Sequence, residues 1–352
     1  MGFFILGKEE TVAGKVGILL LQLGTPDAPT AWAVRRYLGQ FLSDPRVVDW
    51  PKWIWRPVLN AIILTFRPAK SAAKYKLIWD DTTGSPLMMH SKRQVELLQE
   101  RFPEAIVALG MTYGNPSVDS AIDSLREKGV DRIIAVPMFP QYSATTTAAA
   151  TDALFHSLSR HSVKRVPDVR TVPAHPTDPG YIEALAVSVE EDLAKLPWKP
   201  ERFVISFHGI PKRYCQQGDI YATHVKQTTL KLVERLGWKR GEWRQTFQSR
   251  FGPETWLKPY TDDYLKEIAE EGVRKVFVVA PGFSADCLET IDEIGREFLE
   301  EFHHAGGEDL RLCPCLNDHP RWIDAVEALI RAEGNGWIVP KSADRFEPAP
   351  TA

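Results

Sequence analysis

One histidine of this chain stands where a predicted strand ends. The run Phe203-Val-Ile-Ser-Phe207 is apolar enough for a buried strand, and His208-Gly209-Ile-Pro211 follows it with a sharp turn. Imidazole titrates near neutral pH, so its neutral form can accept a proton or bind a metal. A core histidine with a satisfied hydrogen bond is the alternative, although the turn favours an exposed ring at the strand tip.

A row of carboxylates is the second candidate for chemistry. Four glutamates recur every four residues along a predicted amphipathic helix: Glu289, Glu293, Glu297 and Glu301. Like charges at this spacing cost about 0.2–0.5 kcal/mol per pair, so the row needs a reason. It suits hydrated divalent cations or protons, because hard cations prefer oxygen ligands. Two alternatives stay open, namely a solvated helix face and a capping box in which Glu289 closes on Asp286.

A cluster of hydroxyl groups follows a third predicted strand. Gln141-Tyr142-Ser143 precedes three threonines at the start of a predicted helix. Such hydroxyls either cap the helix or bind an anionic ligand, and both interpretations stay open. The ring of Tyr142 could stack on a flat ligand.

Tryptophans are concentrated in one segment of the chain. Eleven occur in the whole sequence, and Trp50, Trp53 and Trp55 lie together between residues 47 and 66, among basic residues. This mixture is typical of an interface between water and an apolar phase, either a lipid surface or a large hydrophobic substrate. An ordinary helix packed on the core is the alternative.

Eight short apolar runs can position these groups. The first four predicted strands are Val16–Leu23, Ile106–Met111, Arg132–Met138 and Val169–Val172, and the second four are Phe203–Phe207, Arg244–Gln248, Lys275–Ala280 and Leu310–Cys313. Helical periodicity fills most of the intervals, as in Val118–Lys128 and Asp262–Glu271. This alternation predicts an α/β protein with parallel sheets and crossover helices.

The two sets of strands resemble each other in detail. Leu23-Gly24-Thr-Pro26 matches His208-Gly209-Ile-Pro211, and Pro137-Met-Phe139 matches Pro281-Gly-Phe283. We infer an internal duplication that produces two Rossmann-like domains, each with a four-stranded parallel sheet. The expected domains are residues 12–174, with an insertion at about 47–85 that forms a lip, and residues 175–335, followed by a flexible tail at 336–352.

The duplication also predicts where a ligand binds. In open parallel sheets, ligands bind beyond the carboxyl ends of the strands. Two facing domains would therefore form a cleft lined by the segments that follow each strand. The candidates for chemistry are residues that break the repeat there, above all His208 in place of Leu23.

Composition excludes several classes of protein. The chain has 352 residues and a net charge of −3, whereas nucleic-acid-binding proteins usually carry a basic excess. No phosphate-binding glycine motif and no nucleophile elbow occurs in the sequence. The four cysteines are too few for a disulfide scaffold and are expected to be reduced thiols. Without a signal peptide or an uninterrupted apolar span, the expected compartment is the cytoplasm, with peripheral membrane contact through the tryptophans left open.

Taken together and in order, these motifs resemble the bacterial branch of the ferrochelatase family. The resemblance runs from about Val16 to Leu329. It rests on the histidine strand, on the acidic motif, and on shorter strings at Gln22–Pro26, Gly84-Ser85-Pro-Leu, Pro140–Ser143 and Cys315-Leu-Asn-Asp318. It implies a chelatase-like fold that inserts Fe²⁺ into protoporphyrin IX to make protohaem. A chelatase for another tetrapyrrole or metal, such as coproporphyrin or cobalt, and a non-catalytic haem carrier are the alternatives.

The resemblance also implies roles for individual residues. His208 and Glu289 would be the catalytic pair and the inner metal ligands, and Glu293 and Glu297 would continue an acidic path. Contacts with the macrocycle or its propionates would come from Leu23, Arg67, Ser85, Tyr142 and Ser143. No cofactor is expected, since iron is a substrate. A two-iron, two-sulfur cluster is not expected either, because residues 338–352 contain no cysteine.

Overall fold

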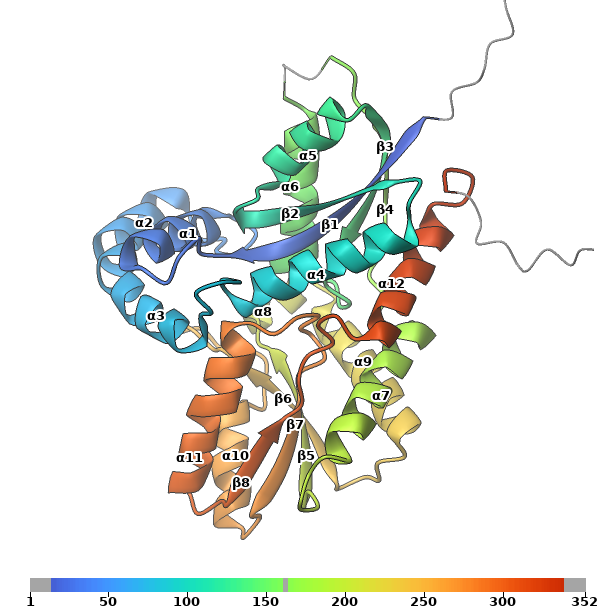
Figure 1. Ribbon diagram of the computed structural model, residues 1–352. Helices are drawn as coiled ribbons and strands as arrows, with labels where there is room; N and C mark the ends of the chain where they lie inside the picture. The colour runs from blue at the N-terminus through green and yellow to red at the C-terminus, as the bar shows by residue number, and fades with distance from the viewer. Residues whose placement is uncertain (1–13, 161–163, 339–352) are drawn as a thin grey trace, which may run out of the picture.

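Two parallel sheets organise the computed structural model, which describes residues 14–160 and 164–338 (Figure 1). The first sheet has the strand order β2-β1-β3-β4, and the second repeats it as β6-β5-β7-β8. The strands are β1 Lys15–Thr25, β2 Ile106–Gly114, β3 Val130–Pro137, β4 Asp168–Thr171, β5 Arg202–His208, β6 Trp243–Gln248, β7 Lys275–Val279 and β8 Asp309–Leu312. All their pairings are parallel. The predicted fold class is confirmed.

Helices connect the strands and cover both faces of each sheet (Figure 1). In the first half they are α1 Ala31–Ser43, α2 Lys52–Val58, η1 Leu59–Ile63, α3 Leu64–Ile78, α4 Pro86–Arg101, α5 Val118–Glu127, η2 Ala144–Ala148 and α6 Ala149–Leu158. In the second half they are α7 Pro179–Leu193, α8 Lys212–Gln216, α9 Tyr221–Leu236, α10 Thr261–Glu270, η3 Glu289–Phe298, α11 Leu299–His304 and α12 Pro320–Glu333. The three η elements are π-helices.

The two halves share one core. A single hydrophobic cluster contains Leu20 from β1, Phe277 from β7, Tyr181 from α7 and Trp322 from α12. Helix α12 packs against α7 and also reaches α4 of the first half (Figure 1). Because apolar side chains of both halves bury one another, the two sheets are held in a fixed relative orientation. The domain limits inferred from the sequence remain a prediction.

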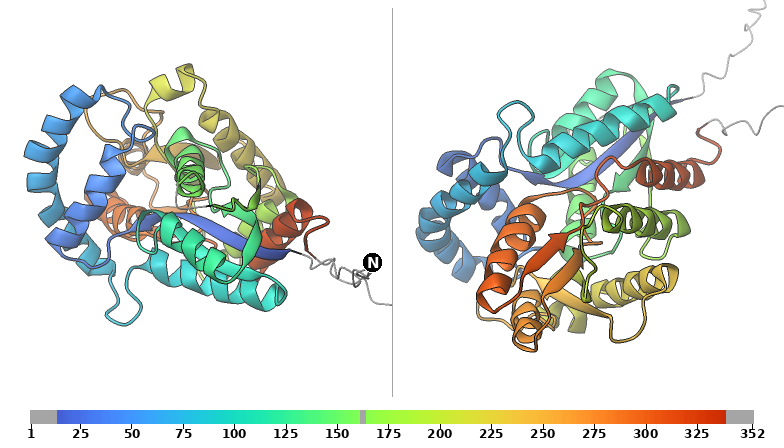
Figure 2. Two further views of the ribbon diagram at one scale, coloured as in Figure 1. Left: turned by 90° about the horizontal axis from the view of Figure 1, so that it is seen from above. Right: turned by 60° about the horizontal axis from the view of Figure 1, so that its bottom comes forward.

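The insertion predicted at residues 47–85 forms helices that stand beside the sheets, blue in both views of Figure 2. Its inner face belongs to a separate core cluster that includes Leu59, Leu64 and Tyr75. Across the described residues, we find no helix that is both long enough and apolar enough to span a bilayer.

Two residues at the start of the predicted tail, Trp337 and Ile338, contact the core. Ile338 is buried in the shared core, and Trp337 lies against it. The guanidinium of Arg170, in β4, lies 4.1 Å from the centroid of the Trp337 ring. The remainder of that segment, residues 339–352, lies outside the described residues.

Candidate active site

His208 is the last residue of β5 and is partly buried. Its Nδ1 lies 2.6 Å from the carbonyl oxygen of Gly209. A carbonyl oxygen can only accept, so Nδ1 carries the proton of the neutral ring and the lone pair is on Nε2. The centroids of the Trp256 and Phe283 rings lie 6.3 and 6.4 Å from that of the imidazole, so two aromatic side chains are close to it. Nε2 is therefore a candidate proton acceptor or metal ligand at a strand tip.

The turn after His208 explains why the sequence needs Gly209. The Gly209 N–H donates to the carbonyl oxygen of Gln248 at 2.8 Å. A Cβ at this position would come within 3.1 Å of both that oxygen and the Trp256 ring. The tip of β5 is further held by the Tyr221 hydroxyl, which donates to the His208 carbonyl at 2.9 Å. These contacts place the imidazole firmly.

The acidic helix differs from its prediction. Residues Glu289–Phe298 form a π-helix rather than an α-helix, and only Leu299–His304 continue as α-helix. Wider i→i+5 turns are rare and recur at functional sites. The duplicated position after β3 also carries a π-helix, η2. Apolar periodicity cannot separate the two helix types, because both bury one stripe of side chains.

The capping-box alternative for Glu289 is wrong. The N–H of Asp286, which Glu289 would have to reach, donates instead to Oδ1 of Asn317 at 2.8 Å. The backbone of Glu289 is bonded to the end of β6, the neighbour of the histidine strand, since Nε2 of Gln248 donates to its carbonyl oxygen at 3.0 Å. Gln248 therefore bridges the turn after His208 and the first residue of η3, which brings the two predicted catalytic residues into one bonded cluster.

Cys287 lies directly beside the Glu289 carboxylate. Burial raises the pKa of this thiol well above its usual value, and the Glu289 charge raises it further. The thiol is therefore neutral at physiological pH, and the carboxylate has a weak S–H donor next to it. Cys287 and the other three cysteines are all unpaired thiols.

Glu293 is the most perturbed carboxyl of the row. Burial raises its pKa to about 7, and hydrogen bonds from the Ser249 hydroxyl and N–H limit that rise. Ser249 holds the carboxylate from a left-handed backbone conformation, φ 64°, just after β6. A carboxyl group that titrates near neutrality can take up and release protons in the working pH range.

The outer part of the row is neutralised by cations. Nζ of Lys74 lies 2.7 Å from Glu297, and Arg296 contributes a second contact at 3.2 Å. Arg296 also pairs at 2.7 Å with Asp292, whose side chain is almost fully buried. Lys74 belongs to α3 of the insertion, so sequence spacing could not reveal its contact with η3. Glu297 is thus less available as a cation ligand than its position in the row suggests.

The predicted macrocycle contacts lie in several environments. Leu23 packs with Leu288 against the core of the insertion. The guanidinium of Arg67, in α3, contacts Phe251 of the second half, 4.6 Å from the centroid of its ring. Tyr142 is partly buried, and its N–H donates to Nδ1 of His224 at 3.1 Å.

Two predicted hydroxyls act as helix caps. Ser85 is buried and caps α4 through a 3.2 Å bond from the Met88 N–H. Ser143 caps η2 and donates to Asp219 of the second half at 3.0 Å. For Ser143 the structure therefore shows the capping alternative. Sequence reasoning missed Asp219, although it follows α8 close to the histidine turn.

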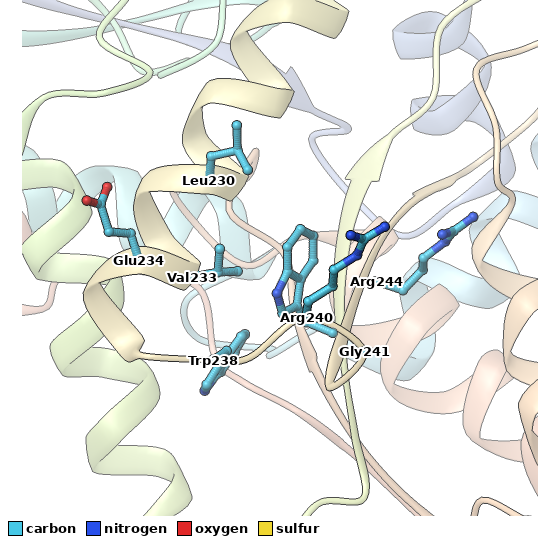
Figure 3. A pocket seen from close by; sticks show the side chains of 8 residues that line it. Leu230, Val233, Glu234, Trp238, Arg240, Gly241 and Arg244 are labelled. Atoms are coloured by element: carbon cyan, nitrogen blue, oxygen red, sulfur yellow. The ribbon is translucent and has the colours of Figure 1, made fainter.

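A hollow of about 570 Å³ lies elsewhere, at the opposite end of the second sheet (Figure 3). It is lined by the end of α9 and the start of β6, including Trp238, Arg240 and Arg244. His208 ends β5 at the other edge, so this hollow is not part of the candidate site. Over the described ranges, no three His, Cys, Asp or Glu side chains converge into a metal-binding group.

Comparison with known proteins decides the family. The family model described as Ferrochelatase matches residues 15–334. The chain belongs to the ferrochelatase family. A ferrochelatase of Mesorhizobium japonicum is 48% identical over 336 residues, which cover 94% of this chain and 95% of that protein. A ferrochelatase of Brucella canis is 48% identical over 328 residues, covering 92% and 93%.

Solved structures support the ferrochelatase family fold. SirB from Bacillus subtilis, solved with Fe³⁺, has a TM-score of 0.54 at 14% identity and covers 92% of this chain and 97% of its own. The sirohydrochlorin chelatase SirB from Bacillus subtilis subspecies spizizenii, in complex with cobalt, has a TM-score of 0.53 at 11% identity, covering 92% and 96%. At these identities the likeness concerns the fold alone.

Proposed function

We propose that this protein inserts ferrous iron into protoporphyrin IX, the terminal step of haem biosynthesis. The observation that carries the proposal is the match to the ferrochelatase family across nearly the whole chain. In this metal-chelating lyase reaction, two pyrrole N–H bonds break and two protons leave, and the iron forms bonds with all four ring nitrogens. The protein must accept those protons and bring the iron to the centre of the ring.

His208 is suited to the first task. Because its Nδ1 proton is committed to Gly209, the lone pair on Nε2 is free to take a pyrrole proton. The imidazolium that forms would then have Glu289 near it, at the start of η3. We propose that these two side chains are the catalytic pair and that they also bind the incoming iron, which is a substrate, so that no cofactor is required.

We propose that the acidic row beyond them carries protons outward. Glu293 titrates near neutrality, which supports transfer of a proton, whereas a permanent anion would favour a bound cation. Glu297 continues the path but already has Lys74 and Arg296 as counter-charges. The cations at the outer end oppose the passage of a proton less than that of a divalent metal, because the repulsion scales with the charge of the moving ion.

Glu293→Gln is expected to remove the rise of kcat with pH on the acidic side of the pH profile. If Glu293 must be ionised to accept a proton, kcat of the wild type rises about tenfold between pH 6 and 8, and the variant loses this rise. The contribution of Glu293 to the free energy of unfolding changes with pH in the opposite direction to kcat. The raised pKa makes Glu293 stabilising at low pH, and that contribution is lost as pH rises toward 7.

Stopped-flow insertion rates and thermal midpoints across this range would measure both effects. The matched control is Glu301→Gln, farther along the same helical segment, where the carboxylate pairs with Lys266 at 3.2 Å. A variant at Glu293 that keeps the wild-type pH profile would contradict its role in proton transfer.

The macrocycle contacts also remain proposals. We propose that Leu23, Arg67 and Tyr142 line the bound porphyrin, Arg67 by facing a propionate, and that Ser85 and Ser143 lie at its edge. The contact between Arg67 and Phe251 supports this assignment, because it joins the insertion to the turn after β6, which also carries Ser249.

Metal insertion itself tests the proposed function. We expect anaerobic incubation with protoporphyrin IX and Fe²⁺ or Zn²⁺ to replace the free-base visible bands with those of the metalloporphyrin. Parallel incubations with coproporphyrin and with Co²⁺ test the alternative substrates. Porphyrin binding without any insertion would instead show a tetrapyrrole carrier and overturn the proposal.

We further propose that the protein is cytoplasmic and that its insertion binds the surface of a membrane. Trp53 is 79% exposed, and Ile62, Phe66 and Leu77 are also exposed on the same helices. Residues 50–79 contain six basic and no acidic residues, which suits anionic lipid headgroups. Trp55 is different, because its Nε1 donates to the Leu42 carbonyl at 2.6 Å and its ring packs in the insertion core.

Trp53→Ser combined with Ile62→Ser is expected to weaken vesicle binding at least tenfold. Burial of each large apolar side chain contributes about 1.5–3 kcal/mol of binding free energy, so the loss of two such side chains weakens binding by more than tenfold. Sedimentation with vesicles of phosphatidylcholine and phosphatidylglycerol measures the change, with kcat unaltered. Phe155→Ser, which removes an exposed aromatic residue from α6, is the control. Equal binding by both variants would disprove membrane contact at the insertion.

A further inference from the structure

The segment Cys315-Leu-Asn317-Asp318 has no part in the function described so far. It follows β8 and lies beside the connection between β7 and η3. Asn317 has a left-handed backbone conformation, with φ of 48°. Few residues other than glycine adopt this conformation, and asparagine is among those that tolerate it. The strained position suggests that the Asn317 side chain has a specific task.

Asn317 and Asp286 bind each other reciprocally. Nδ2 of Asn317 donates to Oδ2 of Asp286 at 2.7 Å, and the N–H of Asp286 donates to Oδ1 of Asn317 at 2.8 Å. The N–H of Asn317 adds a bond to the Ser284 carbonyl at 3.0 Å. Three bonds therefore join the segment after β8 to the connection that leads into the acidic helix.

Asp286 passes this restraint on to the start of η3. Its buried carboxylate also accepts the Thr290 hydroxyl at 2.9 Å and the Cys315 N–H at 3.3 Å. The Thr290 oxygen in turn accepts the Cys287 N–H at 3.0 Å. The bonded residues at 286, 287 and 290 thus flank Glu289 on both sides, and they restrain the backbone that carries its carboxylate.

The same network extends to the first half of the protein. Nε2 of Gln94, a fully buried residue of α4, donates to the Asn317 carbonyl at 2.6 Å. Asn317 is therefore bound both to the half that carries Glu289 and to the opposite half. Such a network limits the freedom of Glu289 relative to both sheets, whereas loss of one member leaves buried polar groups unpaired.

We propose that Asn317 and Asp286 are positioning residues that set where the π-helix begins and hold the Glu289 carboxylate in its working place. This inference rests on the proposed role of Glu289 in metal insertion. A catalytic group misplaced by about 1 Å can lose a factor of about one hundred in rate. The effect should therefore fall on kcat and leave porphyrin binding intact.

A side-chain exchange tests the proposal. Asn317→Asp places two carboxylates against each other, and we expect kcat for Zn²⁺ or Fe²⁺ insertion to fall 10–100-fold while the porphyrin Kd changes less than threefold. Adding Asp286→Asn restores the hydrogen bond between the two side chains, because the amide now at position 286 can donate to the carboxylate now at position 317. The double variant should recover kcat to within about threefold of the wild type.

Asp192→Asn separates positioning from plain destabilisation. Asp192 is a buried residue of α7 in the second half and pairs with Arg311 at 2.6 Å. We expect it to lower the thermal midpoint about as much as Asn317→Asp while keeping kcat within twofold. Hydrogen exchange at residues 287–291 should accelerate only in Asn317→Asp.

Two results would overturn the proposal. One is an Asn317→Asp enzyme with wild-type kcat, and the other is a double variant that stays as slow as the single one. Either result leaves the proposed function standing if the wild type inserts metal and Glu289→Gln does not. Failure of the wild type to insert metal would remove the proposed function instead.

Discussion

Replacing His208 with alanine should reduce kcat for metal insertion by about a thousandfold while the porphyrin still binds. Removal of a positioned proton acceptor typically costs a factor of 10²–10⁴. Here the Nδ1 proton is held by Gly209, so Nε2 is the only ring atom left to accept a pyrrole proton. Porphyrin affinity should change less than fivefold, because an extended macrocycle contacts many other residues.

Insertion under anaerobic conditions and quenching of porphyrin fluorescence measure the two quantities separately. His303→Ala is the control, since that imidazole lies on the surface of α11 and bonds only a backbone carbonyl, that of Glu308, at 2.9 Å. Chelation by His208→Ala at the wild-type rate would remove this residue from the mechanism. Loss of porphyrin binding would show instead that the residue mainly holds the macrocycle.

Glu289→Gln should be the second most damaging substitution, with kcat reduced about a hundredfold. Glutamine keeps the size of the side chain but removes the negative charge that would stabilise the imidazolium of His208 or hold the incoming iron. A charge-assisted hydrogen bond is about twice as strong as a neutral one, and its loss is greatest in a partly buried site.

The same substitution has a spectroscopic consequence at the neighbouring thiol. The charge of Glu289 contributes to the raised pKa of Cys287, so glutamine at position 289 should lower that pKa. Thiolate absorbance at 240 nm, titrated in the wild type and in the variant, would detect the change. The Cys287→Ser protein provides the baseline. An unchanged insertion rate in Glu289→Gln would show that Glu289 takes no part in the reaction and is a solvated helix residue.

Much of the fold could be read from periodicity and turn residues. Parallel strands buried on both faces are nearly continuous apolar runs, and β1 is such a run, with Ile18–Leu21 fully buried. Repetition of the motif pairs predicted two sheets with the same strand order, as the structure shows. His208 was identified by its place at a strand end, which depends only on local sequence.

Other features depend on residues that are distant in the chain. The bonds of Asp286 with Asn317 and with Thr290 precede and enter η3, and apolar spacing predicts neither these bonds nor the π-helical turns. The counter-charge on Glu297 comes from Lys74, 223 positions away. Burial raises the pKa of Glu293 and the bonds from Ser249 limit that rise, and neither effect is a property of the local sequence.

The sequence by itself determined the strands, the duplicated order, the position of His208 and the family. These features depend on the pattern of side chains and on the residues that form turns, and both are properties of short stretches of sequence. Only the tertiary structure decided how the carboxylates differ from one another. Charge and burial at a site depend on which distant elements pack around it. Packing made Glu289 a residue whose backbone is bonded to Gln248, raised the pKa of Glu293 to about 7, and paired Glu297 and Glu301 with cations.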